Sequence, residues 1–242
     1  MARKHKHKHP SKKTTTPTTT TPSPDASSSS SSSSTPLFFW KPTEPETGYL
    51  SQWYVQPFRD SSNKTYPTAE HYMMHHKALL FRDEEIARFI LETDSPRAVK
   101  SLGRAVRNFD DKIWLSERER IVTEGNYFKF AFPVREKGDD DDDDDDGLWR
   151  LGLCDDAKTV QAPRFRDVLL ATGDRELVEA STFDRIWGIG FAAKGAEAKR
   201  HKWGENLLGK CLMEARDRLR KEVEAEAETA MMENGEEVHT PA

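Results

Sequence analysis

The stretch Tyr66-Pro67-Thr68-Ala69-Glu70-His71-Tyr72-Met73-Met74-His75-His76-Lys77-Ala78 decides how the chain folds. Pro67 disfavours a helix in the residue before it, and Thr68 is a good N-cap, so we predict a helix that begins at Ala69. A core-facing stripe at helical spacing is predicted along this helix. Its members are Ala69, Met73, His76 and Leu80.

Two charged side chains of this helix lie away from that stripe. Glu70 falls in the first turn, where the helix dipole favours an ionised carboxylate. Lys77 follows seven residues later, two turns along the same face. Such a pair can line a polar pocket, or it can be a solvated helix face with an incidental charge pair, and the residues alone leave both interpretations open.

The histidines of this helix, His71, His75 and His76, raise the question of a metal. Their order differs from the His-Glu-x-x-His of zinc hydrolases, and no third ligand stands out. We therefore expect packed or exposed histidines, no metal and no cofactor.

Apolar patterning and capping residues predict the other elements. Strands are predicted at Leu37 to Trp40, within Gly48 to Arg59 and at Glu176 to Ser181; helices at Asp83 to Glu92, Ser95 to Arg107 with Pro96 in its first turn, Asp110 to Phe130, from Phe165 to Thr172-Gly173, and from Asn206 with a stripe of Leu208, Leu212, Ala215 and Leu219. The sum is a mainly α domain with a small β component (α+β).

Composition sets the limits of this domain. Residues 1–35 are basic and then rich in Ser, Thr and Pro, so we expect a disordered tail. The compact domain is predicted over 36–219, with an acidic inserted loop at 132–162 that contains eight consecutive Asp residues. Residues 220–242 are expected to be a fraying acidic tail.

Charge and cysteine content exclude several classes of protein. The net charge of −5 resides largely in the tails and the Asp run, which argues against a dedicated basic face for duplex DNA. The two cysteines, Cys154 and Cys211, have no motif spacing, as is usual in a reducing compartment. Because neither a membrane span nor a secretory signal is recognisable, we expect a cytoplasmic or nuclear protein.

A second informative stretch is Phe183-Asp184-Arg185-Ile186-Trp187-Gly188. The letters from Gly188 onward match a dinucleotide fingerprint, but no clean apolar strand precedes them. We predict instead a loop that carries Asp184 beside Trp187, with an ordinary turn capped by Asp184 as the alternative. Gly103 and Gly209 lie inside predicted helices, where they either permit close packing or expose the backbone to a ligand.

Together these stretches resemble the NADAR, or YbiA-like, domain family. The matching segments are Leu50-Ser51-Gln52-Trp53, Tyr66 to Tyr72, Lys77-Ala78, Leu102-Gly103-Arg104, Trp114, Phe183 to Gly188, and Gly204-Glu205-Asn206-Leu207-Leu208-Gly209. They occur in family order over nearly the whole predicted domain. The tails and the Asp insertion lie outside the resemblance, and the insertion departs from shorter bacterial members at the rim of the expected pocket.

The resemblance implies a single compact, mostly helical YbiA-like domain that cleaves N-glycosidic bonds. In the family, one branch hydrolyses phosphoribosylated intermediates of riboflavin biosynthesis and another removes ADP-ribose from guanine bases. The implied partner is a small-molecule N-riboside or an ADP-ribosylated nucleobase, with nucleic acid only as a modified substrate. The implied catalytic residues are Glu70, Asp184 and Lys77. The implied substrate-binding residues are Trp114, Arg104, Gly103, Trp53, Trp187, Gly188 and Asn206.

Two chemical routes follow from these residues. In the first, Glu70 or Asp184 lies beside C1′ and orients water, while the other stabilises the sugar or relays a proton. In the second, Lys77 attacks C1′ of an opened ribosylamine and forms a Schiff base. A non-catalytic reader of ADP-ribose, or an interaction protein that acts through its tails, are the alternatives from other functional classes.

Overall fold

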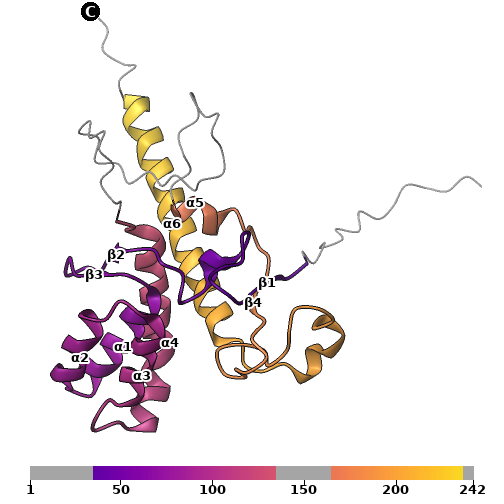
Figure 1. Ribbon diagram of the computed structural model, residues 1–242. Coiled ribbons are helices and arrows are strands. Elements are labelled where there is room, and N and C mark those ends of the chain that lie inside the picture. The colour runs from indigo at the N-terminus through magenta and orange to yellow at the C-terminus, as the bar shows by residue number, and fades with distance from the viewer. Residues whose placement is uncertain (1–34, 135–164, 237–242) are drawn as a thin grey trace, which may run out of the picture. The chain divides into compact units, whose positions relative to one another are not determined.

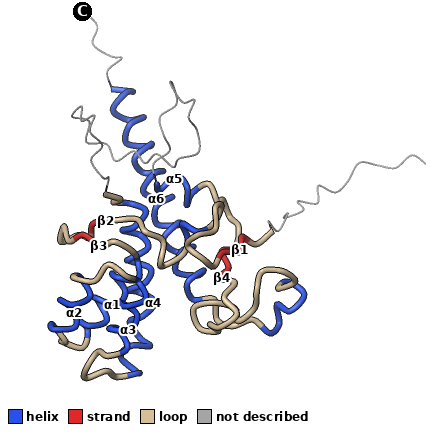
Figure 2. Tube along the Cα trace, viewed as in Figure 1, coloured by secondary structure: helices blue, strands red, loops and turns tan. Residues whose placement is uncertain are grey.

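The computed structural model describes residues 35–134 and 165–236, the last four of these by their backbone alone. Most of the predicted N-terminal tail, the Asp run and the end of the C-terminal tail lie outside these residues. The described elements are β1 (Leu37–Phe39), the 3-10 helix η1 (Gly48–Leu50), β2 (Phe58–Arg59), β3 (Thr65–Tyr66), α1 (Ala69–Leu80), α2 (Glu84–Leu91), α3 (Pro96–Arg104), α4 (Asp111–Ala131), α5 (Phe165–Leu170), β4 (Leu177–Glu179), the 3-10 helix η2 (Glu197–Lys202) and α6 (Leu207–Glu236). Helices dominate and the strands are short, which confirms the predicted fold class (Figures 1 and 2).

Side-chain caps begin four of the helices where the sequence predicts them. The hydroxyl of Thr68 accepts a hydrogen bond from the His71 amide at the start of α1, and Asp83, Ser95 and Asp110 cap α2, α3 and α4 in the same way. The predicted extension of α3 to Arg107 is wrong. The Arg107 amide donates to the Asp83 carboxylate at 2.8 Å, so this residue closes a turn against α2 and does not continue the helix.

The strands form two separate pairs. β1 and β4 are parallel, with Leu37 opposite Leu177 and Phe39 opposite Glu179, whereas β2 and β3 are antiparallel. The strand predicted within Gly48 to Arg59 is confined to the last two residues of that range, Phe58–Arg59. The buried Lys129 ammonium donates to the carbonyls of Tyr49 at 2.6 Å and Ser51 at 3.0 Å, so a side chain occupies acceptors that a neighbouring strand would use.

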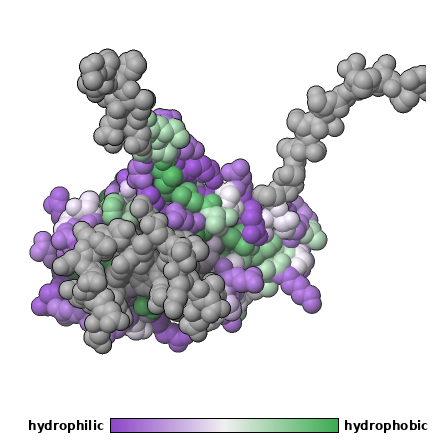
Figure 3. All heavy atoms as spheres, turned by 90° about the horizontal axis from the view of Figure 1, so that it is seen from above, coloured by the Kyte–Doolittle hydropathy of each residue, from purple (hydrophilic) through white to green (hydrophobic). Residues whose placement is uncertain are grey.

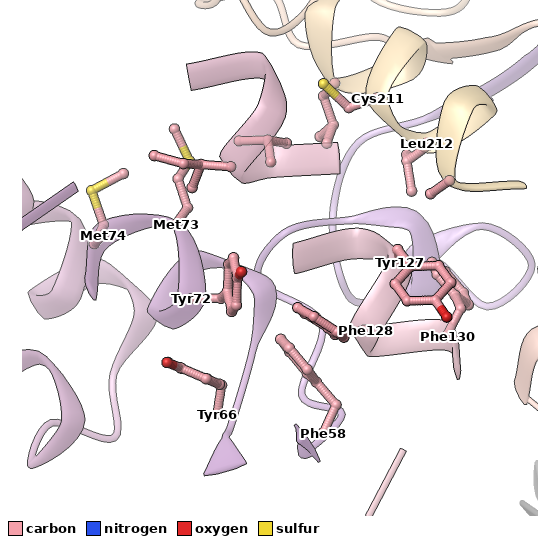
Figure 4. Close-up of a cluster of buried hydrophobic side chains, with 14 of the residues drawn as sticks. Phe58, Tyr66, Tyr72, Met73, Met74, Tyr127, Phe128, Phe130, Cys211 and Leu212 are labelled. Carbon is pink, nitrogen blue, oxygen red and sulfur yellow. The ribbon is translucent and has the colours of Figure 1, made fainter. Parts of the chain in front are cut away.

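The main core lies among α1, α4 and α6 (Figure 4). α2, α3 and α4 all pack on α1, so that helix is buried on nearly every side. Of the predicted stripe on α1, Ala69 and Met73 are buried. His76 and Leu80 are only half-buried, whereas the residues from Glu70 to Tyr72, outside the stripe, are buried. A Cβ atom at Gly103 would lie 2.0 Å from the Met74 sulfur, which shows why glycine is required for α3 to approach α1 so closely.

The C-terminal helix α6 packs along α4, and the predicted stripe from Leu208 to Leu219 is buried. The helix continues to Glu236, into the segment for which a fraying tail is predicted, and its side chains from 224 to 232 are exposed. In Figure 3, polar residues lie along the edges of the described surface, and a band of apolar residues runs between them. Among the described residues, no helix combines the length and the apolar character needed to cross a membrane.

Candidate functional site

Glu70 occupies the first turn of α1 and is only 5% exposed. Its amide donates to the Gln52 carbonyl at 3.0 Å, which ties α1 to the turn after η1. Burial raises the pKa of Glu70 to about 7, against the opposing effects of the Lys100 charge, a hydrogen bond from Trp53 and the Arg104 charge. The interpretation of a solvated helix face is therefore wrong, and desolvation outweighs the helix dipole that favours the ionised form.

Asp184 lies in the turn from Phe183 to Gly188. One of its carboxylate oxygens accepts hydrogen bonds from the amides of Ile186 and Trp187, both at 2.8 Å, so the capping interpretation holds for that oxygen. The Asp184 charge also contributes to the raised pKa of Glu70. The fold thus brings two acids that are far apart in the sequence close enough to interact electrostatically.

A third acid, Glu179, joins them at the end of β4. Burial raises the pKa of Glu179 to about 8; the charges of Asp184 and Glu70 add to this rise, and Lys100 opposes it. Its Oε2 atom is buried and has no hydrogen-bond partner among the described residues. Sequence reasoning treated this stretch only as a strand. One feature of the sequence could have indicated a functional role for Glu179: it is the single charged residue in the otherwise apolar stretch Leu177-Val178-Glu179-Ala180.

Asn206 and two glycines fix the backbone around Glu179. The Asn206 side-chain oxygen accepts from the Glu179 amide at 3.0 Å, and its nitrogen donates to the Leu177 carbonyl at 2.9 Å. A Cβ atom added to Gly188 would lie 2.8 Å from the carbonyl oxygen of Glu179, and one added to Gly209 would lie 2.0 Å from the carbonyl oxygen of Leu177. Asn206 and Gly188 were predicted to bind substrate; their contacts show that they hold β4 beside the Asp184 turn.

Two cations of α3 face the acids. Lys100 and Arg104 lie one helical turn apart, and both positive charges act on Glu70. The Lys100 ammonium lies 5.9 Å from the centre of the Trp53 ring, and Trp53 in turn hydrogen-bonds to Glu70. Arg104 was predicted as a substrate-binding residue, whereas Lys100 was missed because a lone lysine in a predicted helix carries no distinctive signal.

Lys77 forms the other end of the site. Its ammonium donates to the Gly103 carbonyl at 2.8 Å and lies 4.3 Å from the centre of the Phe109 ring and 5.4 Å from that of Trp114. Burial lowers the pKa of Lys77. Seven residues of helix separate it from Glu70, a rise of about 10 Å along the axis. The predicted pair therefore marks two ends of one face and does not form a direct ion pair.

Trp187 connects the Asp184 turn to α4. The Arg118 guanidinium lies 5.9 Å from the centre of the Trp187 ring and also pairs with Glu205 at 3.2 Å. Trp114 lies one turn before Arg118 on α4 and packs, half-buried, against the core, as Trp187 does. Trp187 thus adjoins the Asp184 carboxylate, whereas Trp114 lies at the Lys77 end of the site, and a planar base or a cationic sugar is the kind of ligand that such rings bind.

The histidines of α1 have structural partners. His71 shares a hydrogen bond of 2.7 Å with the Thr68 hydroxyl and one of 2.6 Å with the Thr93 carbonyl. His75 and His76 both contact the Tyr66 hydroxyl. Within residues 35–134 and 165–236, no group of three His, Cys, Asp or Glu side chains is arranged to hold a metal ion.

Comparison with known proteins gives the site a context. The NADAR domain model matches residues 38–220. N-glycosidase R617 of Acanthamoeba polyphaga mimivirus is 38% identical over 174 residues, covering 69% of this chain and 85% of the viral protein. N-glycosidase YbiA of Escherichia coli (strain K12) is 28% identical over 177 residues, covering 73% and 84%.

One solved structure and one further relative complete the comparison. The NMR structure of Escherichia coli YbiA matches with a TM-score of 0.54 and 26% identity, covering 78% of this chain and 86% of that one. The riboflavin biosynthesis protein VVA0006 of Vibrio vulnificus (strain YJ016) is 26% identical over 184 residues, which is 76% of this chain but 38% of that protein.

Proposed function

The chain belongs to the NADAR domain family, and from that premise we propose that it is an N-glycosidase that hydrolyses the ribose–nitrogen bond of a phosphoribosylated or ADP-ribosylated compound. Relatives from a virus and from bacteria carry the name N-glycosidase. The observation that carries the proposal is the convergence of Glu70 with Asp184, whose charge acts on Glu70, beside the Trp53 ring and two cations.

The chemistry of the bond explains why this arrangement is suitable. Breaking a ribose–nitrogen bond develops positive charge at C1′ and negative charge on the departing base, so carboxylates near the sugar stabilise the transition state. Glu70, whose pKa is about 7, is half ionised at neutral pH and can accept a proton from the attacking water. Asp184 then stabilises the sugar cation, one of its oxygens being fixed by the turn.

The cations of α3 indicate the class of substrate. The charges of Lys100 and Arg104 both act on Glu70, and their spacing of one helical turn supports binding of two oxygens of one phosphate there. Phosphoribosylated riboflavin intermediates and ADP-ribosylated guanine both offer such a phosphate on the ribose side of the bond. Similarity to a riboflavin biosynthesis protein favours the first, although that relative is much longer than this chain.

A direct test uses the purified full chain with a panel of phosphoribosylated and ADP-ribosylated N-ribosides, and mass spectrometry to detect the released base. We expect Glu70→Gln and Asp184→Asn each to lower turnover by at least about a hundredfold while folding survives. Asp174→Asn is the matched control, because the Asp174 side chain is 92% exposed and pairs with Arg220 at the surface. Near-normal turnover in both site variants would remove the assignment.

The Schiff-base route rests on the lowered pKa of Lys77 and its contacts with Trp114 and Gly103. In that route the amine of Lys77 adds to C1′ of the opened sugar, the base leaves as its amine, and water cleaves the resulting imine. Borohydride reduces this imine to a stable adduct. Absence of an adduct at Lys77, with activity intact in Lys77→Ala, eliminates this route and leaves hydrolysis by the carboxylates.

A non-catalytic reader of ADP-ribose is the remaining alternative. Such a module would bind the same ligands without releasing a base. The buried Glu70 and its raised pKa oppose this alternative, because a site that only binds anionic ligands gains nothing from a desolvated carboxyl group. Calorimetric binding of ADP-ribose together with no base release from any N-riboside in the panel would establish the reader.

A further inference from the structure

Glu179 is held more rigidly than an ordinary strand residue. Its amide donates to Asn206 at 3.0 Å, and its carbonyl accepts from the Ile189 amide at 2.9 Å. The parallel pairing of β4 with β1 fixes the strand on the other side, with Phe39 opposite Glu179. Its backbone is therefore tied to β1, to the loop after the Asp184 turn, and to the residue that precedes α6.

The Glu179 side chain lies among the groups of the site. Its charge interacts with Asp184, Lys100 and Glu70, which come from three different elements. Its Oε2 atom is buried without a hydrogen-bond partner in the described part of the chain. The residue as a whole is only half-buried, whereas Glu70 is 5% exposed, so Glu179 is the more accessible of the two to a ligand.

A buried carboxyl oxygen without a partner costs stability unless a ligand supplies the partner or the group serves the chemistry. The charges of Asp184 and Glu70 add like-charge repulsion to this desolvation cost at Glu179. A leaving base that enters the site would bring a nitrogen atom, which is the acceptor that a protonated carboxyl group requires.

We propose that Glu179 is the acid that protonates the departing nitrogen, an inference that rests on the N-glycosidase function proposed above.

Water adds to C1′ through oxygen and gives one proton to Glu70. The electron pair of the C1′–N bond moves to nitrogen, which takes the proton of Glu179. The products are the free base, with a new N–H bond, and the sugar, with a hydroxyl group at C1′. Transfer of the acquired proton from Glu70 to Glu179 restores the starting state.

The protonation states favour this division of roles. Burial, with the charges of Asp184 and Glu70, holds the pKa of Glu179 at about 8, so the group carries a proton at pH 7. The charges of both Lys100 and Arg104 oppose the rise in the pKa of Glu70, to about 7, whereas Lys100 alone of these two opposes it at Glu179. Two neighbouring carboxyl groups with separated pKa values are a frequent arrangement for an acid and a base in one site.

The experiment compares the wild-type chain with Glu179→Gln on a series of N-ribosides whose leaving bases differ in acidity. We expect the variant to lose a hundredfold or more in kcat on the poorest leaving base and progressively less as the base becomes more acidic. The alkaline limb of the pH profile should disappear as well. Glu176→Gln is the control, since Glu176 opens the same stretch but pairs with Arg200 at the surface, and it should behave as wild type.

A carboxyl titration supplies a readout that does not depend on turnover. In protein labelled with ¹³C at the glutamate carboxyl, the signal absent from Glu179→Gln should be that of a protonated group at pH 6. A signal of an ionised carboxylate at pH 6, an equal loss on all leaving bases, or near-normal turnover of Glu179→Gln would each overturn the proposal. If the wild-type chain itself releases no base, the proposed function fails, an outcome distinct from activity that survives loss of Glu179.

Discussion

Replacing Glu70 by glutamine should make the protein more stable at alkaline pH while it loses activity. Glutamine keeps the size of the side chain and an oxygen that accepts from Trp53, but it does not ionise. The pKa of Glu70 is raised in the folded chain from its ordinary 4.5 to about 7, so the folded state holds this proton more tightly than the unfolded state does. The stabilisation from this proton is complete below pH 4.5 and is lost as the pH rises through 7.

The size of the effect follows from the shift. Between pH 5 and pH 9 the wild-type chain should lose about 2.5 kcal/mol of unfolding free energy through Glu70 alone, whereas Glu70→Gln loses none of it. The difference in unfolding free energy between variant and wild type should therefore move by about 2.5 kcal/mol in favour of the variant over this range. In a domain of this size that corresponds to about 5 to 10 °C in Tm.

The assay is urea denaturation of both proteins at pH 5, 7 and 9, followed by tryptophan fluorescence. Any fixed cost of the new amide group is the same at every pH, so only the trend is diagnostic. Asp174→Asn serves as a reference for the loss of an acid whose side chain is 92% exposed. If the difference in unfolding free energy between Glu70→Gln and wild type stays constant from pH 5 to pH 9, the claim that burial raises the pKa of Glu70 is refuted.

Three further predictions follow from the contacts of the site. The pH dependence of kcat/KM should be bell-shaped with its maximum between pH 7 and 8, because activity needs an ionised Glu70, whose pKa is about 7, and a protonated Glu179, whose pKa is about 8; a flat profile from pH 6 to 9 contradicts this. Lys100→Met should raise the pKa values of Glu70 and Glu179, because the positive charge of Lys100 lowers both. Both limbs of the pH profile should then move to higher pH, and KM for a phosphorylated substrate should rise about tenfold. Unchanged limbs would show that Lys100 does not act on the two acids. Gly103→Ala should destabilise the chain by about 1 to 3 kcal/mol, because the new methyl group meets the Met74 sulfur, and thermal unfolding within 1 °C of wild type would count against that contact.

Local signals predict the helices well. Thr68, Asp83, Ser95 and Asp110 each cap the helix that follows, because an N-cap acts through hydrogen bonds within three residues. The predicted strand before Phe58 fails for the opposite reason. Lys129, nearly eighty residues later, supplies the donors for that segment, and no local pattern announces such a contact.

The candidate site also combines residues that local sequence motifs reveal with residues that only the folded chain brings together. Glu70 and Asp184 stand in motifs that the sequence reveals, but the pKa of Glu70 depends on its burial and on the opposing effects of Trp53 and of the α3 charges, which arise only on folding. Glu179 has no motif of its own. It enters the site because Asn206 and the pairing with β1 place β4 beside the Asp184 turn, and these contacts exist only in the folded chain.

The most direct test of the account is a crystal structure of Glu70→Gln bound to the N-riboside that the wild-type chain cleaves fastest. We expect the ribose C1′ atom to lie between residue 70 and the Asp184 carboxylate, with the sugar phosphate against Lys100 and Arg104. A ribose bound elsewhere on the chain, or one whose C1′ is out of reach of both side chains, would contradict the claim that these two acids form one glycosidase site.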